Sequence, residues 1–378
     1  MKLGSTGMFL GAAAIAVLCL LGAAAHAQTA PDKVPMTDEV FKSVMLLKGI
    51  PVDTFFEAMG MFANSMGNDC TFCHSQAAVF DKAKFAEQTP RILKARQMIV
   101  MMNTINKQFF GGQTRVTCFT CHNGSDRPRS EPDLALQYAE PVFDPNAREI
   151  VPADPRVTAN QVFDKYIQVL GGADRLAKLT SYVAKGTYAG FDTDFSEIPV
   201  EIYAAAPNRM TVVTHLSTGI NTKAYNGSSG WIAGPDTPLP LVTLTAGNLD
   251  RARLEAIVAF PAAIRQAFSE WRVGIAVIGD QGLQVVQGLR DGQPAANLYF
   301  DDSGLLVRLV TWTRTPVALV PTQIDYADYR DVAGVKVPFK RTVSQTYMRM
   351  VIEVTDVQPN VAIDRKLFER PAPVAPAA

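Results

Sequence analysis

CTFCH at residues 70–74 and CFTCH at residues 118–122 are two copies of one pattern, C-x-x-C-H. This pattern is typical of c-type haem attachment. The two thiols bond to the haem vinyl groups, and a neutral imidazole nitrogen of the adjacent histidine binds the iron. We therefore expect two covalently bound haem c groups. The attachment residues are Cys70, Cys73, Cys118 and Cys121, and the proximal iron ligands are His74 and His122.

The cysteine inventory supports haem. Beyond residue 27 every cysteine lies in these two stretches, so none is left over for a disulfide. A zinc site made of all four thiolates is the alternative, because C-x-x-C pairs also bind zinc. That alternative leaves the histidine after each pair unexplained. Two C-x-x-C-H stretches in one exported chain favour haem.

The N-terminus has the pattern of an export signal. Lys2 supplies the positive charge, residues 8–25 are apolar, and Ala25-His26-Ala27 is a small-residue cleavage site. We expect residues 1–27 to be removed and the protein to be periplasmic, on the oxidising side of the membrane. If the segment were not cleaved, it would anchor the protein in the membrane, since its length lies at the lower edge of a spanning helix.

Composition limits the function classes. The chain has 378 residues, of which 48% are hydrophobic, which is enough for two or three domains with sizeable cores. Lys and Arg number 36, and Asp and Glu also number 36, so the formal net charge is zero. A nucleic-acid partner is not expected, because such proteins carry a basic surplus. The sequence contains no P-loop, dinucleotide fingerprint or serine-hydrolase motif.

Each attachment stretch follows a predicted helix and a glycine turn. One helix is expected from Thr37 to just before Gly49, and a second helix from residue 53 to 66 leads through Gly67 to the first stretch. Thr89-Pro90 begins a helix over residues 91–110, which leads to the second stretch. The sequence therefore predicts an internal repeat with one haem in each unit.

Residues 37–125 resemble the cytochrome subunit family of photosynthetic reaction centres. The resemblance rests on residues 55–74, on Ala95-Arg96-Gln97-Met98 through residue 106, and on residues 116–122. It implies that each haem lies against the helix before its attachment stretch, and that a methionine of that helix is the sixth iron ligand. The namesake carries four haems, whereas this chain has two attachment stretches, so a general periplasmic electron relay is expected instead of a photosynthetic role.

For the first haem, Met59 is the candidate distal ligand. It lies eight residues before Gly67, roughly 12 Å along a helix, about the span of a haem lying alongside. Met66 is too close to Cys70 to reach over the macrocycle. Met61 is rotated by about 200° from Met59. The family position also favours Met59.

For the second haem, Met101 is the candidate distal ligand. Met98 and Met102 lie on a predicted core stripe with residues 105 and 109, whereas Met101 is offset from it and also matches the family position. Met98 and Met102 remain alternatives. His215 is the one histidine left for a ligand role, and a surface or rim position on a strand is expected for it.

The remainder of the chain predicts a linker and a second domain. Residues 126–158 are polar and proline-rich, which is typical of a linker. Residues 159–370 are expected to form an α+β domain, and residues 371–378 a tail. Two helices over 159–170 and 173–179 should precede an antiparallel meander. A helical insertion over residues 249–268 is expected after its fourth strand. Strands are expected at 182–188, 200–205, 209–216, 222–225, 271–278, 283–289, 296–300, 305–313, 322–329, 335–337 and 341–354.

This second domain resembles the curved half-barrel of periplasmic lipoprotein carriers of the LolA and LolB kind. The landmarks that carry the resemblance are Leu170-Gly171-Gly172, Lys185-Gly186-Thr187, Tyr225-Asn226-Gly227 with Trp231, Leu298-Tyr299-Phe300, Asp328-Tyr329-Arg330 and Pro338-Phe339. The expected architecture is therefore multidomain. An all-α dihaem cytochrome c domain (residues 28–125) precedes an α+β antiparallel half-barrel.

The sequence favours electron transfer between redox partner proteins through two His/Met-ligated haems, without catalysis. Two alternatives remain. The first is a haem enzyme, such as a peroxidase or small-molecule reductase, which needs one open iron site and an acid–base partner. The second is a binding module in which the C-terminal domain holds a hydrophobic ligand such as a lipid or a quinone-like molecule. Fold analogy alone does not assign that ligand.

Overall fold

The computed structural model describes residues 33–139, 147–235, 237, 239–278 and 281–372. The predicted export signal and the last residues of the predicted tail lie outside these ranges. The chain divides into two compact units, Met1–Val34 and Pro35–Ala378. The second unit contains every helix and strand named below. Among the described residues, no helix has the length and apolar character needed to cross a bilayer.

The first part of this unit is helical. Its elements are α1 (Thr37–Val40), α2 (Val52–Met66), η1 (Cys70–Phe72), η2 (Gln76–Val79), η3 (Lys82–Ala86), α3 (Pro90–Phe109), α4 (Cys118–His122) and α5 (Leu134–Gln137). Helix α2 ends at Gly67, whose φ of 64° is left-handed, as is common for a helix C-terminus. Helix α3 begins with Pro90 after Thr89, whose side chain accepts a hydrogen bond from the Ile92 amide. Both helices were predicted within a residue or two.

The helix expected from Thr37 to Gly49 is much shorter than predicted, because α1 ends at Val40. The following residues fold back as a loop. The Thr37 hydroxyl donates to the Leu47 carbonyl at 2.7 Å, and the Gly49 amide donates to Asp38 Oδ1 at 2.8 Å. Short polar side chains that bond the backbone in this way compete with helix formation.

The rest of the chain forms one antiparallel sheet of 14 strands. The strands are β1 (Val151–Pro152), β2 (Ser181–Gly190), β3 (Ile198–Ala205), β4 (Arg209–Leu216), β5 (Gly219–Tyr225), β6 (Gly230–Ala233), β7 (Leu241–Thr243), β8 (Glu270–Ile278), β9 (Gln281–Arg290), β10 (Gln293–Phe300), β11 (Leu306–Arg314), β12 (Leu319–Val332), β13 (Val335–Ser344) and β14 (Arg349–Pro359). Their order across the sheet is β1-β8-β9-β10-β11-β12-β13-β14-β2-β3-β4-β5-β6-β7. The expected large antiparallel domain is confirmed in this form.

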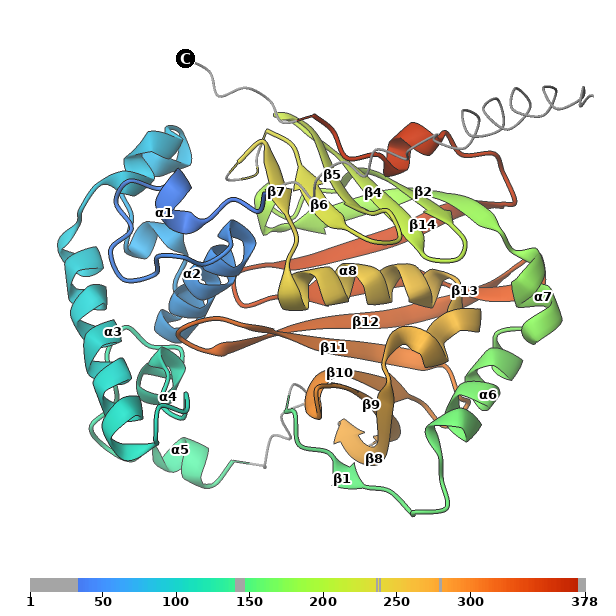
Figure 1. The fold of residues 1–378 in the computed structure, drawn as a ribbon, viewed down its shortest axis with the longest axis horizontal. Helices are drawn as coiled ribbons and strands as arrows, with labels where there is room; N and C mark the ends of the chain where they lie inside the picture. The colour runs from blue at the N-terminus through green and yellow to red at the C-terminus, as the bar shows by residue number, and fades with distance from the viewer. Residues whose placement is uncertain (1–32, 140–146, 236, 238, 279–280, 373–378) are drawn as a thin grey trace, which may run out of the picture. The chain divides into compact units, whose positions relative to one another are not determined.

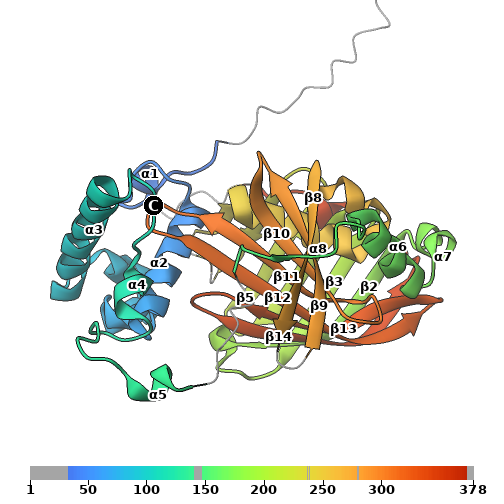
Figure 2. The same cartoon turned by 90° about the horizontal axis from the view of Figure 1, so that it is seen from below.

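Helices cover one face of the sheet. They are α6 (Ala159–Val169), α7 (Ala173–Lys178) and α8 (Ala246–Ala259), together with the 3-10 helix η5 (Pro261–Ala267), which packs against all three. Two further 3-10 helices in this part are η4 (Phe191–Thr193) and η6 (Arg365–Phe368). Helix α8 lies along the sheet, with α6 and α7 on the same side (Figure 1 and Figure 2). The main core lies between them, and Phe163, Leu254, Leu298 and Leu309 are completely buried there.

The strand predictions differ from the structure in two main respects. Strands β6 and β7 were not predicted, so the helical insertion follows the sixth strand after α7 and not the fourth. The stretch predicted as one strand over residues 341–354 is β13 and β14, joined by a turn in which the Gln345 amide donates to the Met348 carbonyl at 2.8 Å. This turn contains no Gly, Pro or Asn, so the usual turn signals are missing.

The predicted linker is attached to the sheet. Within it, β1 pairs with β8, and Val151 lies opposite Ile275. The side chain of Gln287 donates to the Arg148 carbonyl at 2.7 Å. This part of residues 126–158 is therefore an edge of the sheet domain.

Candidate functional site

The first attachment stretch is a tight turn that local hydrogen bonds fix. Asp69 caps η1, since its Oδ1 accepts from the Thr71 amide at 2.8 Å and from the Thr71 hydroxyl at 2.6 Å. The next helix holds the other end, because the Thr89 hydroxyl donates to the Cys73 carbonyl at 2.5 Å and Arg91 donates to the Phe72 carbonyl at 2.7 Å. The positions of Cys70, Cys73 and His74 are thus defined by backbone contacts on both sides.

The His74 imidazole is oriented for metal binding. Its Nδ1 lies 3.1 Å from the Phe85 carbonyl oxygen, and the Phe85 ring packs edge-on against it at 5.0 Å between centroids. A hydrogen bond from Nδ1 to a carbonyl fixes the tautomer and leaves Nε2 free to bind a metal. Desolvation also lowers the His74 pKa, which favours the neutral ring that a metal requires.

The second attachment stretch repeats this arrangement on a short helix. Thr117 caps α4 by accepting from the Thr120 amide at 3.3 Å, and Thr120 Oγ1 accepts from the Thr117 amide at 3.0 Å. The Nδ1 atom of His122 lies 3.1 Å from the Ser125 carbonyl oxygen. Both histidines therefore use Nδ1 on a backbone carbonyl, and both leave Nε2 available.

None of the four thiols forms a disulfide bond. Burial raises the pKa of Cys70, with a smaller contribution from Asp69, and it raises the pKa of Cys73 as well. It raises the pKa of Cys118 to about 11. Among the described residues, no three Cys, His, Asp or Glu side chains are gathered as metal ligands. The arrangement does not support the alternative of a four-thiolate zinc site, because the thiols do not converge.

Helix α2 has two apolar faces. Met61 is 7% exposed and packs with Ala318 and Val320 of the sheet domain. Met59 points to the other side, where it is half-buried with Phe55 and Phe62. The expectation that Met61 faces away from Met59 is confirmed, and Met59 packs in a separate cluster that includes Met102 and Val317 of the β11–β12 turn.

The methionines of α3 are distributed around the helix. Met102 is 4% exposed in a cluster with Leu47, Ala58 and Ile99, whereas Met101 is 45% exposed. Met98 is half-buried. Met101 thus lies on a partly exposed face of α3, and Met102 fills the core between α2 and α3. These positions are compatible with a ligand role for Met101 without testing it.

The two attachment stretches are neighbours through α2. Gly124, which follows the second stretch, donates its amide to the Ser65 carbonyl at 3.0 Å. A Cβ atom at Gly67 would lie 2.2 Å from the Gly124 carbonyl oxygen, so this approach requires glycine. Cys118 and Val116 belong to the same apolar cluster as Met59. The predicted repeat units are therefore packed together.

Several supporting residues were not found from the sequence. The carbonyls of Phe85 and Ser125 orient the histidines, but a backbone acceptor leaves no mark in residue type. Asn106 holds the loop segment before the second stretch. Its Oδ1 accepts from the Arg115 and Val116 amides at 3.0 and 2.9 Å, and its Nδ2 donates to the Val116 carbonyl at 2.7 Å. Asparagine has a low helix propensity. Its presence inside a predicted helix could therefore have suggested that Asn106 bonds to residues outside that helix.

His215 lies on β4, away from both stretches in the sequence. Its Nε2 is 3.5 Å from Glu201 Oε2, and its side chain is 38% exposed. This is the surface or rim position expected from the strand pattern.

Helix α2 is anchored to α8 by buried polar contacts. Asp53 accepts hydrogen bonds from the Thr245 amide at 2.6 Å, the Thr245 hydroxyl at 2.7 Å and Asn248 Nδ2 at 3.1 Å. Four residues on, Glu57 is 3% exposed, and its Oε1 lies 3.8 Å from Arg251 Nη1. Burial raises the pKa of both carboxyl groups. The helix that carries Met59 is therefore fixed on its opposite face.

Comparison with known proteins agrees with the N-terminal resemblance. The model of the photosynthetic reaction centre cytochrome C subunit family matches residues 20–133. The photosynthetic reaction center cytochrome c subunit of Roseobacter denitrificans is 29% identical over 98 residues, which cover 22% of this chain and 26% of that protein. The chain thus spans about a quarter of its relative. The resemblance stated from residues 37–125 is confirmed, and this family implies covalently bound haem.

Solved structures also match the C-terminal part. A LolA superfamily protein from Nitrosomonas europaea is 12% identical, with a TM-score of 0.36, and covers 57% of this chain and 98% of its own. A DUF1329 family protein from Desulfovibrio piger is 10% identical, with a TM-score of 0.38 and the same two coverages. The first of these is of the kind named from the sequence landmarks.

Proposed function

We propose that this protein is an exported dihaem c-type cytochrome that passes electrons between redox partner proteins. The main support for the proposal is that His74 and His122 have the same orientation relative to the backbone. Each places Nδ1 at 3.1 Å from a backbone carbonyl oxygen and leaves Nε2 free. A histidine that binds a metal commonly has such a partner, and the two cysteines before each histidine favour haem iron as that metal.

The residues fit a haem in each stretch. Cys70 and Cys73 would hold one group and Cys118 and Cys121 the other, with His74 and His122 as iron ligands. Met59 and Met101 would be the distal ligands. When bound, haem supplies one-electron chemistry at a potential that its axial ligands and surroundings set. The histidine–carbonyl contacts orient the imidazoles and raise their basicity.

The surface of the helical part also supports the proposal. Large apolar side chains that are exposed occur repeatedly between residues 79 and 119. They include Phe80, Leu93, Val100, Met101, Phe109 and Phe119. Exposed apolar surface of this extent indicates a ligand or a partner. A porphyrin beside each attachment stretch would cover much of it.

Export to the periplasm, with redox proteins as partners, is part of the proposal. It is supported by the signal-like N-terminus and by the unpaired cysteines, which haem attachment would use. A haem enzyme with one open iron site is the rival. It needs an acid–base group opposite the histidine, and the sequence offers no free histidine near either stretch.

The test is an optical and EPR spectrum of the haem-loaded protein and of Met59→Ala, Met101→Ala and Met61→Ala. We expect two low-spin His/Met haems in the wild type. Each of the first two variants should convert one haem to high spin. Met61→Ala is the matched control, because Met61 lies on the same helix but faces the sheet, and it should leave the spin state unchanged.

Two outcomes would contradict the proposal. A wild-type haem that is already high-spin and binds cyanide readily would move the enzyme alternative ahead. An unchanged spectrum for Met101→Ala would exclude that residue, and Met98→Ala and Met102→Ala would then identify the ligand.

A further inference from the structure

The two proximal histidines are oriented by partners of different kinds. The Nδ1 atom of His122 lies 3.1 Å from the carbonyl oxygen of Ser125, three residues on in the same turn. The Nδ1 atom of His74 lies 3.1 Å from the carbonyl oxygen of Phe85, eleven residues away in η3. The orientation of His122 is therefore set locally, whereas that of His74 depends on where η3 lies.

The 3-10 helix η3 is connected to the sheet domain through Lys82, its first residue. The Lys82 Nζ atom donates to the carbonyl oxygen of Pro235 at 2.5 Å and to that of Thr237 at 3.0 Å. Both acceptors belong to the loop between β6 and β7. The next lysine of η3, Lys84, instead pairs with Glu87 at 2.8 Å, and its side chain is 44% exposed. Lys82 thus links the helix that orients the first histidine to the sheet domain.

The loop between β6 and β7 offers a defined pair of acceptors. The Gly234 amide donates to the Pro240 carbonyl at 3.2 Å, and the Thr237 hydroxyl donates to the Gly234 carbonyl at 2.7 Å. Hydrogen bonds with a charged donor are stronger than neutral ones, and one ammonium group can donate several of them. The two bonds from Lys82 are therefore expected to hold the start of η3 against this loop.

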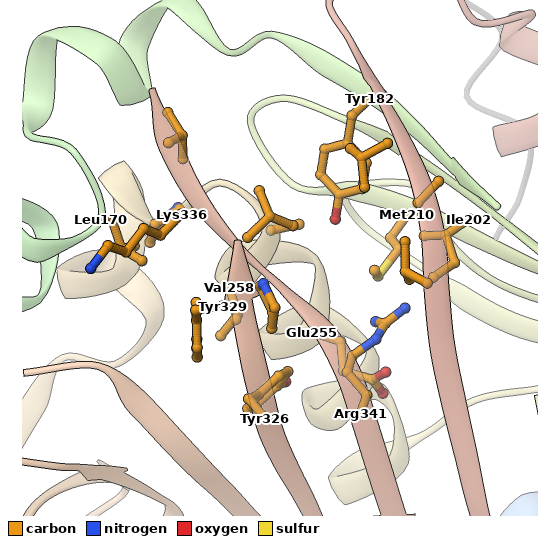
Figure 3. A pocket seen from close by; sticks show the side chains of 18 of the residues that line it. Leu170, Tyr182, Ile202, Met210, Glu255, Val258, Tyr326, Tyr329, Lys336 and Arg341 are labelled. Carbon is orange, nitrogen blue, oxygen red and sulfur yellow. The ribbon is translucent and has the colours of Figure 1, made fainter. Parts of the chain in front are cut away.

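This contact is separate from the one that anchors α2. Met210 of β4 is one of the side chains in the small cavity between the helices and the sheet (Figure 3). Successive side chains of a strand point to opposite faces, so Thr211 lies on the other face, where it lines a pocket that Lys82 also lines. Asp53 bonds to α8 on the helix-covered face. The sheet domain therefore contacts the helical part from both of its faces, and the outer contact is the one that reaches η3.

The position of η3 affects the iron that His74 would bind. A hydrogen bond from Nδ1 fixes the orientation of the ring and raises the basicity of the imidazole, and the haem potential depends on both. We propose that Lys82 is a positioning residue for the first haem, because it ties η3 to the β6–β7 loop and so holds the Phe85 carbonyl against His74. The inference rests on the proposed function, since it requires haem at residues 70–74. It assigns the sheet domain control over the potential of the first haem and not of the second.

The experiment is a redox titration of the full-length, haem-loaded protein followed by EPR, with the variants Lys82→Met, Lys84→Met and Lys82→Arg. Both methionine variants remove one positive charge from η3, but only Lys82→Met removes the contact with the loop. Lys82→Arg keeps a charged donor. A form with Cys118→Ser and Cys121→Ser, which has no thiols for the second haem, identifies the EPR signal of the first.

The expected shifts differ in sign. In Lys82→Met the reduced-to-oxidised ratio of the first haem at a fixed potential should rise about 2- to 10-fold, because a weaker hydrogen bond makes the imidazole less basic. A tenfold rise corresponds to about 59 mV for one electron. Loss of a positive charge alone favours the oxidised, more positive iron, so Lys84→Met should lower the ratio or leave it unchanged. Lys82→Arg should stay within about twofold of the wild type, as should the second haem in every variant.

Hydrogen exchange measures the same contact without a redox reading. The Glu87 amide donates to the Lys84 carbonyl at 3.1 Å within η3. In Lys82→Met this amide should exchange at least about twofold faster than in the wild type, because η3 opens more often. The amide of Ser125, beside the second histidine, should exchange at an unchanged rate.

Three results would overturn the inference. The first is a reduced-to-oxidised ratio of the first haem that is no higher in Lys82→Met than in Lys84→Met. The second is an equal upward shift of both haems, which would indicate general loosening of the helical part. The third is unchanged exchange of the Glu87 amide in Lys82→Met. Failure of the proposed function would look different, because the wild-type spectrum itself would then lack two low-spin haems.

Discussion

Replacing Asp53 with alanine should loosen the contact that holds α2 against the sheet domain. The Asp53 carboxylate accepts three hydrogen bonds, two from Thr245 and one from Asn248. In Asp53→Ala these donors lose their acceptor. Asn248 is 2% exposed, so water cannot readily replace the carboxylate at its Nδ2 atom.

The size of the effect follows from these contacts. A hydrogen bond to a charged group contributes about 1.5–3 kcal/mol, and a buried donor without a partner costs about 1–3 kcal/mol. The burial of the carboxylate, which raises the pKa of Asp53, opposes part of this gain. We therefore expect Asp53→Ala to lower the free energy of unfolding by about 2–4 kcal/mol.

The assay is guanidinium unfolding of the haem-loaded protein followed by two probes. All three tryptophans, Trp231, Trp271 and Trp312, lie in the sheet domain, so their fluorescence reports on that part. Soret absorbance reports on the helical part. We expect the two transitions to coincide in the wild type and to separate in Asp53→Ala, with the Soret transition at the lower concentration.

Asp38→Ala is the matched control. Asp38 is exposed and accepts one backbone hydrogen bond from Gly49 at 2.8 Å, so its loss should cost about 1 kcal/mol or less. The reasoning is refuted if Asp53→Ala costs no more than this control, or if its two transitions remain coincident.

Four further outcomes are expected. Met61→Ala should lower the free energy of unfolding by about 2–5 kcal/mol in a denaturant titration, because the side chain is buried against the sheet. Gly67→Ala should cost at least about 2 kcal/mol in the same titration, since its φ is 64° and a Cβ would meet the Gly124 carbonyl. Asn106→Ala should cost about 2–3 kcal/mol and reduce the haem-to-protein absorbance ratio, whereas the exposed Asn103→Ala should do neither. The pKa of Asp53 is raised above 3.8, so its contribution to stability is largest below pH 3.8 and declines as the pH rises through the folded-state value. A denaturation series from pH 3.5 to 7 should show this decline in the wild type relative to Asp53→Asn, and equal slopes would contradict it.

Much of the fold follows from the sequence because local signals agree with the final packing. Strand β4 occupies the predicted residues, and α3 begins at the predicted Thr89-Pro90. Where local signals were absent or misleading, the prediction was wrong. The acidic residues after Thr37 indicated a helix start correctly, but α1 ends at Val40, and Asp38 accepts a hydrogen bond from Gly49 across the loop that follows.

The candidate site was predictable in part for the same reason. The proposed attachment residues occur in a spacing that haem chemistry dictates, so the sequence alone predicts them. The carbonyl partners of His74 and His122 cannot be predicted in this way, because every residue has a carbonyl.

The two apolar faces of α2 connect these observations. A helix that is apolar on more than one side must be covered on each. The sheet covers the face that carries Met61, and Asp53 fixes the orientation on that side. The opposite face carries Met59, Phe55 and Phe62, which are half-buried. A porphyrin attached at residues 70–74 is apolar, and it would shield these half-buried side chains from water. The sheet domain would then hold the helix in place, so that the distance between Met59 and His74 is set before haem is attached.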